Sequence, residues 1–368
     1  MLGIKHSAPQ LEIQTLNNGK YDLEKSKTNK FSMIVFYRGY HCPVCKKYLE
    51  TLNSNLAAYK DLGVADIIAV SGDTKERAQK SFEEWDISKL NIGYDLDEQT
   101  MRSWNLYLSN SIKDAEPQVF NEPGLFLIDS DKNLFYVAIN SMPFGRPDLE
   151  GFHKSLKFII DEDYPARGQY REARSIDESE HRENTNHVDD MFIDRWSPRA
   201  FDKDYHLTED QLNKLFGAAK WTPSCYNEQP WSFRVATNDS PQFQKFLDLL
   251  VDMNQDWAKN ASAIVFIIGR KKFAKNDKDN SVYQFDCGAA WMSLTMQARL
   301  MGLYTHGMAG IKKDDVNNYF DLDTDKQEVI CGFAVGKNTT KDVLPEKLQE
   351  KEHLRGRNDL DEFVEFYS

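Results

Sequence analysis

The sequence has few of the features that mark secreted or membrane-spanning proteins. Only 5 of its 368 residues are cysteines, an odd number that is too small for a disulfide framework in a chain of this length. No stretch reaches the roughly 18 apolar residues of a membrane span, and the opening MLGIKHSAPQ does not resemble a signal peptide. We therefore expect a cytoplasmic protein with no membrane partner.

Positive charge is also scarce relative to negative charge. The chain has 46 Lys and Arg residues against 58 Asp and Glu residues, for a formal net charge of −12. An acidic surface does not attract nucleic acid, so we expect none as a partner and favour a small-molecule substrate. We find no internal repeat, and 368 residues are too many for a single hydrophobic core, which predicts two domains.

A polar segment separates these two domains. The stretch ARGQYREARSIDESEHRENTNHVDD, residues 166–190, mixes both charges and has almost no apolar periodicity, so it is a linker or a solvated helical connector. The predicted organisation is therefore a first domain over residues 1–165, a polar linker over 166–190 and a second domain over 191–368.

The two domains differ in the order of their predicted elements. In the first, apolar strands at 33–37 and 65–71 alternate with helices at 46–59 and 74–85, and a hairpin at 124–140 and a helix at 149–160 follow. This alternation is typical of a three-layer α/β domain. The second combines strands at 231–238, 262–269 and 328–336 with a long helix at 287–303, which indicates a helix-rich α+β domain.

The first domain contains one Cys-x-x-Cys motif, Cys42 and Cys45, where an apolar strand gives way to a helix. A thiol at a helix N-terminus faces unpaired backbone N–H groups and the positive end of the helix dipole, which stabilise its thiolate. Pro43 suits the first helical turn. No second Cys-x-x-Cys or His pair lies at ligand spacing, so we expect no metal and interpret the motif as a redox pair.

The order of several motifs in this domain resembles the peroxiredoxin-like branch of the thioredoxin-fold superfamily. These motifs are APQLEIQTLNNGKYDL, FYRGYHCPVCKKYL, IIAVSGDTKERAQKSFEEW, EPGLFLIDSDKNLFYV and MPFGRPDLEGFHKSLKFI. The resemblance implies that Cys42 is the peroxidatic cysteine, that Cys45 resolves its sulfenic acid as a disulfide, and that Arg146 lies behind the active site. It also makes the Glu122–Pro123 bond a candidate cis peptide that faces the cysteines.

One residue departs from the peroxiredoxin pattern. Relatives carry Thr or Ser three residues before the peroxidatic cysteine to hold the peroxide, and this chain has Gly39 there. Two explanations stay open. Either His41 or Tyr40 substitutes for the hydroxyl, or the domain is a dithiol-disulfide reductase that acts on protein partners.

The second domain gathers residues that suit an anionic, planar ligand. Arginines and a serine in RWSPRAF can hold a phosphate, although arginines four apart also occur on a solvated face. The amides of TPSCYNEQPW can bond a heterocycle edge, the glycines of HGMAGI form a small-residue loop, and HLRGRNDL adds two arginines.

In this order the motifs resemble the FMN-dependent nitroreductase family from about residue 191 to the end. The resemblance implies an α+β nitroreductase fold and a homodimer with FMN at the subunit interface. The implied FMN contacts are Arg195, Trp196, Ser197 and Arg199, with Arg355 and Arg357, at the phosphate and ribityl chain, and Ser224, Asn227, Gln229, Asn254, Met308, Ala309 and Gly310 along the flavin ring.

The two resemblances together predict an α/β thioredoxin-like fold followed by an α+β nitroreductase fold. NAD(P)H would reduce FMN, and the electrons would pass to a nitroaromatic, a quinone or a similar acceptor. Because both redox modules share one chain, we hypothesise that electrons also return to the Cys42–Cys45 disulfide, which would make the protein an NAD(P)H-driven peroxide reductase. A flavin-storage role for the second domain and a docking role for the first are the non-catalytic alternatives.

Overall fold

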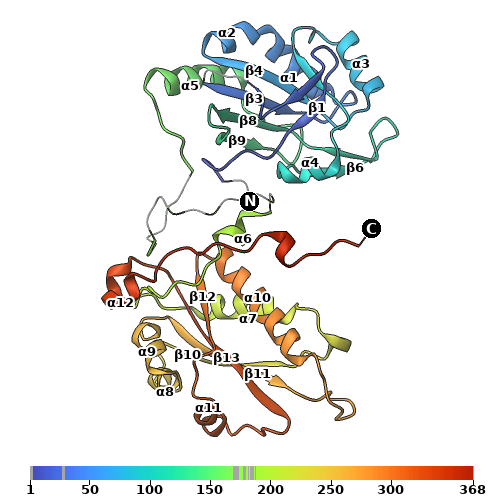
Figure 1. The fold of residues 1–368 in the computed structure, drawn as a ribbon. Coiled ribbons are helices and arrows are strands. Elements are labelled where there is room, and N and C mark those ends of the chain that lie inside the picture. The colour runs from blue at the N-terminus through green and yellow to red at the C-terminus, as the bar shows by residue number, and fades with distance from the viewer. Residues whose placement is uncertain are drawn as a thin grey trace. The chain divides into compact units, whose positions relative to one another are not determined.

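The computed structural model describes residues 3–26, 30–168, 174–176, 180, 182, 186 and 188–367. The chain divides into two units, Met1–Tyr170 and Arg171–Ser368 (Figure 1). Most of the predicted linker over 166–190 lies outside the described residues. No helix in the described part of the chain is long and apolar enough to cross a membrane.

The sheet of the first unit has five strands in the order β5-β4-β3-β8-β9. The pairs β3–β4 and β4–β5 are parallel, whereas β3–β8 and β8–β9 are antiparallel. Two short hairpins, β1–β2 and β6–β7, lie outside this sheet. The strands are β1 Glu12–Gln14, β2 Lys20–Asp22, β3 Phe31–Phe36, β4 Val64–Val70, β5 Asn91–Gly93, β6 Leu108–Asn110, β7 Val119–Asn121, β8 Gly124–Asp129 and β9 Leu134–Ile139.

The central strands of this sheet are buried on both faces, which explains their continuous apolar runs. In β3, Met33 and Val35 face one core cluster, while Ile34 and Phe36 face the other. Helices α1, α2, α3 and α5 contribute to the first cluster, and α4 with the β1–β2 hairpin contributes to the second. The helices are α1 Pro43–Ser54, α2 Leu56–Asp61, α3 Lys75–Glu84, α4 Glu98–Ser103 and α5 Leu149–Asp161.

The first helix departs from its predicted bounds at both ends. It begins at Pro43, three residues before the predicted start, and the helix predicted to reach residue 59 is interrupted at Asn55. The Asn55 side-chain amide donates to the Thr51 carbonyl at 2.8 Å. Asparagine competes with the helical backbone for hydrogen bonds in this way, so it favours helix ends.

The second unit is built on a four-stranded antiparallel sheet in the order β10-β11-β13-β12. Helices α7 and α10 pack against one face, and α8, α9 and α11 pack against the other. The strands are β10 Trp231–Thr237, β11 Ala263–Arg270, β12 Tyr304–Met308 and β13 Gln327–Gly336. The helices are α6 Asp190–Asp194, α7 Glu209–Lys220, α8 Phe243–Asp248, α9 Asp252–Ala258, α10 Tyr283–Leu300, α11 Lys313–Tyr319 and α12 Glu346–Gln349, with 3-10 turns at Cys225–Asn227, Lys341–Val343 and Leu360–Glu362.

Strand β12 is not among the predicted strands, and the prediction that HGMAGI is a loop is wrong for its first three residues. The first three residues of that motif, 306–308, lie in β12 and pair with β13. Gly307 serves packing there, because a Cβ at this position would lie 3.1 Å from Cζ2 of Trp291 on α10. The motif is therefore a strand whose glycine lets a helix approach, followed by a short turn at residues 309–310.

Candidate functional site

The two cysteines of the first unit lie at the N-terminus of α1, in agreement with the sequence analysis. Cys42 is the N-cap residue and Pro43 is the first helical residue. The backbone N–H of Cys45 donates to Cys42 Sγ at 3.2 Å, and the two Sγ atoms lie 2.6 Å apart. A sulfur that accepts a helical N–H in this way is stabilised as a thiolate.

The local contacts separate the acidity of the two thiols. The hydrogen bond with Cys45, with help from the positive charges of Arg38 and Arg146, lowers the pKa of Cys42 to about 7. The same hydrogen bond, together with burial, raises the pKa of Cys45 well above its ordinary value. Near neutral pH, Cys42 is therefore the more nucleophilic of the two thiols.

A cavity of about 210 Å³ opens beside Cys42. Arg38 in its wall is paired with two carboxylates, Glu116 at 3.3 Å and Glu122 at 3.6 Å, and its guanidinium lies 4.7 Å from the Phe120 ring centroid. Cys42 itself is only 2% exposed, so a small molecule reaches its sulfur more easily than a protein surface does. The lining residues are Arg38, His41, Cys42, Pro43, Val44, Lys113, Ala115, Glu116, Pro143 and Phe144.

Gly39 cannot be replaced by a hydroxyl-bearing residue in this structure. Its φ is +124°, a left-handed conformation that favours glycine, and a Cβ there would lie 2.6 Å from Oδ1 of Asp73. The Asp73 side chain is fully buried, accepts the Tyr40 backbone N–H at 2.6 Å and forms an ion pair with Arg77 at 2.7 Å. A buried carboxylate thus fills the space into which the side chain of a threonine or serine at position 39 would extend.

Arg146 lies near the cysteines, where the resemblance expects it. Its guanidinium carbon is 3.4 Å from the centroid of the Tyr48 ring, burial lowers its pKa, and its charge acts on both thiols. The Glu122–Pro123 bond, in contrast, is trans, so the predicted cis peptide is wrong. The trans form is the lower in energy for an X–Pro bond.

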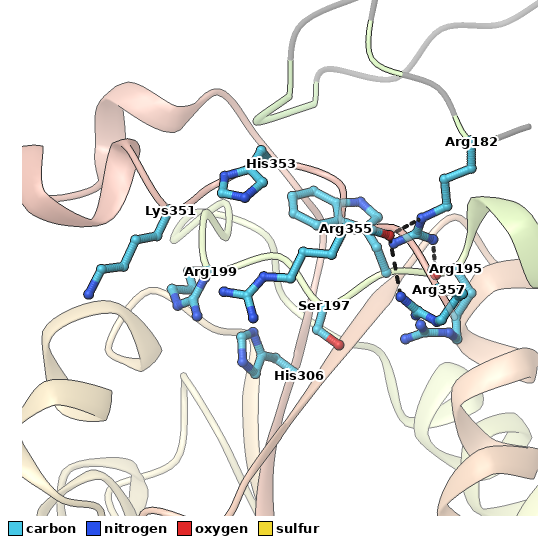
Figure 2. Close-up of a pocket in the computed structure, with 10 residues that line it drawn as sticks. Arg182, Arg195, Ser197, Arg199, His306, Lys351, His353, Arg355 and Arg357 are labelled. Atoms are coloured by element: carbon cyan, nitrogen blue, oxygen red, sulfur yellow. Dashed lines mark hydrogen bonds between the residues drawn. The ribbon is translucent and has the colours of Figure 1, made fainter. Parts of the chain in front are cut away.

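A second cavity, also of about 210 Å³, lies in the second unit. Figure 2 shows basic side chains around it, with Arg182, Arg195 and Arg357 grouped on one side and Lys351, Arg199 and His306 on the other. Most of these residues come from both ends of the unit, near α6 and after α12, and His306 lies in β12. The lining residues are Arg182, Arg195, Trp196, Ser197, Arg199, His306, Lys351, His353, Arg355 and Arg357.

Most of the arginines in this cavity have no carboxylate partner among the described residues. Arg182 donates instead to the carbonyls of Ile193, Arg195 and Arg355 at 2.8–3.0 Å. Burial, followed by the charge of Arg357, lowers the pKa of both Arg182 and Arg195. A cluster of neighbouring positive charges that lower one another's pKa suits an anionic ligand.

Arg199 is the exception, because it is paired with Glu352, whose carboxylate has a structural role. Glu352 lies 3.5 Å from the Arg199 guanidinium and accepts the backbone N–H groups of Arg199 and Ala200 at 2.7 and 3.1 Å. It also accepts the Ser175 hydroxyl at 2.9 Å. Glu352 therefore fixes the segment that carries Arg199 and joins it to the chain after α12.

Two further side chains in this cavity can form hydrogen bonds with a polar group attached to a bound anion. Nε1 of Trp196 is buried without a hydrogen-bond partner among the described residues, which leaves one donor for a ligand. His306 donates from Nδ1 to the Pro198 carbonyl at 2.9 Å, and burial lowers its pKa to about 4. His306 is thus neutral near pH 7, and its Nε2 is an acceptor for a ligand hydroxyl.

The residues predicted along the flavin ring do not line this cavity. Ser224, Asn227 and Gln229 form a self-bonded turn, in which the Gln229 backbone N–H donates to Ser224 Oγ at 2.9 Å and the Gln229 amide bonds Asn227 at 3.1 and 3.2 Å. Tyr226, Asn227 and Gln229 all have positive φ, between +47° and +56°. Strained backbone of this kind is concentrated at ligand-binding positions.

The structure brings together two other predicted ring contacts. The Asn254 side-chain amide donates to the Gly310 carbonyl at 3.0 Å, and a Cβ on Gly310 would lie 2.7 Å from that amide. Ala309 is exposed beside them. Met308 differs, because its side chain is 3% exposed and packs in the core of the unit.

Sequence reasoning missed four residues of this cavity. Arg182 lies in the polar segment, where it is one charge among many, and Lys351 and His353 flank the predicted arginines without a pattern of their own. His306 is the first residue of HGMAGI, whose predicted loop gives this histidine no role. No group of three or more potential metal ligands occurs in the described part of the chain.

Comparison with known proteins matches each unit to a family. Residues 4–137 match the model of the AhpC/TSA family, and residues 193–252 and 239–337 match the model of the nitroreductase family. The oxygen-insensitive NADPH nitroreductase of Helicobacter pylori strain J99 is 31% identical over 185 residues, which cover 41% of this chain and 87% of that protein. The chain belongs to the nitroreductase family. It carries an AhpC/TSA domain ahead of the nitroreductase domain.

Other relatives of this nitroreductase-family chain have different activities in their names. The CLA biosynthesis enone reductase of Lactiplantibacillus plantarum is 27% identical over 188 residues, which cover 41% of this chain and 86% of that protein. A crystal structure described as an oxidoreductase containing FMN is 41% identical, with a TM-score of 0.48, and covers 51% of this chain and 96% of that one. The predicted thioredoxin-like fold followed by a nitroreductase fold is confirmed.

Proposed function

We propose that the second unit is an FMN-dependent NAD(P)H oxidoreductase. The cavity lined by Arg182, Arg195, Arg355 and Arg357 carries this proposal, because it concentrates positive charge without carboxylate partners among the described residues, apart from the Arg199–Glu352 pair. A phosphate with about two negative charges satisfies such a cluster through charge-assisted hydrogen bonds. An FMN-containing relative and NADPH nitroreductase relatives support the choice of ligand.

In this proposal each group in the site has a separate task. The phosphate is held by Arg195, Arg199, Arg355 and Arg357. The ribityl chain of FMN, next to the phosphate, is held by Ser197 and by Nε1 of Trp196. Bound FMN would supply the capacity to take a hydride from NAD(P)H and to reduce a nitroaromatic, a quinone or a similar small acceptor. The ring contacts are Ser224, Asn227, Gln229, Asn254, Met308 through its backbone, Ala309 and Gly310.

The second unit also has a surface suited to a second copy of the chain. Helix α10 is apolar on more than one side. Its buried face includes Cys287 and Leu294, while Phe285 and Leu300 are 78% and 68% exposed. Uncovered apolar surface on a long helix marks an interaction site. We therefore propose a homodimer through this unit, in which a second copy helps to complete the flavin site.

For the first unit we propose a thiol peroxidase. The Cys42 thiolate attacks the terminal oxygen of a hydroperoxide, the S–O bond forms as the O–O bond breaks, and the alkoxide leaves and takes up a proton as an alcohol. The sulfur loses two electrons to the peroxide. Cys45 then attacks the sulfenic acid, forming the disulfide and releasing water. The burial of Cys42 beside a small cavity and its pKa of about 7 support this role.

One observation favours the alternative, a dithiol-disulfide reductase that acts on protein partners. The Asp73 carboxylate fills the space for a hydroxyl at position 39, so the site lacks the group that holds peroxide in relatives. The burial of Cys42 opposes this alternative, because attack on a protein disulfide requires the sulfur to lie at the surface. A direct comparison of hydrogen peroxide and a disulfide-bonded protein as oxidants of the reduced chain separates the two functions.

We further propose that NAD(P)H is the reductant for the disulfide of the first unit, so that the chain is an NAD(P)H-driven peroxide reductase. The test is anaerobic stopped-flow absorbance of the purified chain, first mixed with NADPH and then with peroxide. We expect NADPH to bleach the flavin absorbance and peroxide to restore it. Cys42→Ser should abolish the recovery but leave reduction of a nitroaromatic unchanged.

The same experiment separates the competing functions. A flavin that NADPH does not bleach would indicate storage or sensing instead of catalysis. Recovery at the wild-type rate in Cys42→Ser would contradict electron transfer to the thiols. An alkylation assay that finds the Cys42 pKa near its ordinary value of roughly 8.5 would support a docking role for the first unit.

A further inference from the structure

The missing hydroxyl at position 39 leaves two neighbours as substitutes, and the structure excludes one of them. The Tyr40 hydroxyl donates to the Glu84 carboxylate at 2.6 Å, and its ring stacks on Trp85 with 6.1 Å between centroids. Both contacts hold Tyr40 at the C-terminal end of α3. Tyr40 does not line the cavity beside Cys42, whereas His41 does.

Asp73 connects to His41 through one arginine. Arg77 Nε donates to Asp73 Oδ1 at 2.7 Å, and one terminal nitrogen of the same guanidinium lies 3.4 Å from His41 Nδ1. That nitrogen also donates to the carbonyl of Ala115, another residue that lines the cavity, at 3.1 Å. The three side chains therefore form a continuous chain from a buried carboxylate to the imidazole next to Cys42.

This chain determines where the proton of His41 resides. A guanidinium can only donate, so Nδ1 of His41 accepts and the ring proton is on Nε2. Nε2 is buried and has no hydrogen-bond partner in the described part of the chain. The charged groups that face this ring are Arg38, Asp73, Arg77 and Glu116, and burial with the charge of Arg38 lowers its pKa. His41 is therefore a neutral imidazole with one unused N–H donor.

We infer that His41 donates from Nε2 to the substrate oxygen and so replaces the hydroxyl that Gly39 cannot carry, and that Asp73 and Arg77 are the positioning residues that fix this tautomer. A native site rarely leaves a buried donor unpaired without a use. A hydroperoxide in the cavity supplies the partner. This inference rests on the peroxidase function proposed for the first unit.

His41 acts on the oxygen that leaves. As the Cys42 sulfur bonds to the terminal oxygen and the O–O bond breaks, negative charge develops on the departing alkoxide oxygen. The Nε2–H group stabilises that charge by a hydrogen bond that strengthens as the bond breaks. The alkoxide then takes a proton from water, and His41 returns to its starting state.

The test compares two reactions of Cys42 in the reduced full-length chain. One is oxidation by hydrogen peroxide, which has a departing oxygen. The other is alkylation by iodoacetamide, which has none. We expect His41→Ala to slow oxidation by about 100-fold, as loss of one such donor does, while the alkylation rate measured against pH keeps the same Cys42 pKa. His41→Gln, which retains an N–H donor, should recover part of the oxidation rate.

The positioning residues are tested in the same pair of reactions. Arg77→Met frees His41 to move its proton to Nδ1, so we expect a smaller loss of about tenfold in oxidation and none in alkylation. Arg102→Met is the matched control, because Arg102 also pairs with a carboxylate four residues earlier, Glu98, but on the exposed face of α4. Asp73→Asn, which keeps the shape of the side chain, should resemble Arg77→Met.

The outcomes distinguish this inference from the function on which it rests. A wild-type chain that reacts with peroxide no faster than a free thiol of the same pKa would overturn both. A fast wild type with an equally fast His41→Ala would overturn only the role of His41. Equal losses in oxidation and alkylation would show a merely structural histidine and would also overturn it.

Discussion

The two cavities have the same volume, about 210 Å³ each, but they differ in whether their arginines are paired with carboxylates. Beside Cys42, Arg38 is paired with Glu116 and Glu122, and Arg77 is paired with Asp73. In the cavity of the second unit, Arg199 has a carboxylate partner, whereas the other lining arginines donate to backbone carbonyls or have no carboxylate partner in the described part of the chain. An arginine that is paired with a carboxylate can fix the position of neighbouring residues, whereas an arginine without such a partner is available to bind an anionic ligand.

The cavities also differ in how far apart their residues lie in the sequence. The cavity beside Cys42 is formed by three local segments, 38–44, 113–116 and 143–144. The arginine cavity joins the first residues of its unit, 182–199, to residues 351–357 near the end of the chain. An anion that binds there connects distant parts of one unit, so its binding stabilises the folded unit by mass action.

The largest effect on stability should come from a substitution at Gly39, because a side chain there would disturb the Asp73–Arg77 ion pair. Gly39→Ser places a Cβ against the Asp73 carboxylate in a left-handed backbone, so we expect the free energy of unfolding of the first unit to fall by about 3 kcal/mol. Gly19→Ser is the control, because Gly19 also has positive φ but a Cβ there meets nothing within 4 Å. It should cost about 1 kcal/mol. Urea unfolding followed by tryptophan fluorescence measures both, and equal losses would refute the clash.

The next effect concerns the unpaired charges. Arg195→Met should weaken FMN binding by about 10- to 100-fold, since a hydrogen bond from a charged donor contributes about 1.5–3 kcal/mol. It should also reduce the dependence of FMN affinity on salt concentration. Lys214→Met, on an exposed Lys214–Asp210 pair of the same unit, should leave both unchanged. Titration of the apoprotein with FMN by flavin fluorescence measures the affinity, and an Arg195→Met variant that binds like wild type would place the phosphate elsewhere.

The smallest effect follows pH at the first cavity. Because the pKa of Cys42 is lowered to about 7, its thiolate is nearly complete above pH 8 and falls about tenfold for each pH unit below the pKa. The alkylation rate should therefore drop by about tenfold from pH 7.5 to pH 6. Iodoacetamide kinetics across this range measure it, with Cys45→Ser as a variant in which the profile shifts to higher pH. A profile that Cys45→Ser leaves unmoved would show that Cys45 does not set the acidity.

The sequence predicts those parts of the molecule that depend on short, contiguous sequence motifs. The apolar run of β3 and Pro43 after Cys42 predict the dithiol at a helix N-terminus, and the RWSPRAF motif contains four of the ten residues that line the arginine cavity. Asp73 was not predicted, because its contact with Gly39 joins residues 34 positions apart and depends on the tertiary fold. Strand β12 was missed since its glycine serves packing against Trp291, which a local pattern does not reveal.

The contact between Gly39 and Asp73 also constrains how this domain can change by mutation. A chain with this backbone gains nothing from a threonine at position 39 while the carboxylate at position 73 is present, and it loses the support of Arg77 if the carboxylate is removed first. Each single change is therefore harmful, and the pair together would open room for a hydroxyl while the side chain at position 39 still met the unfavourable φ of +124°. A hydroxyl at position 39 thus requires a change of backbone conformation as well as the loss of the carboxylate.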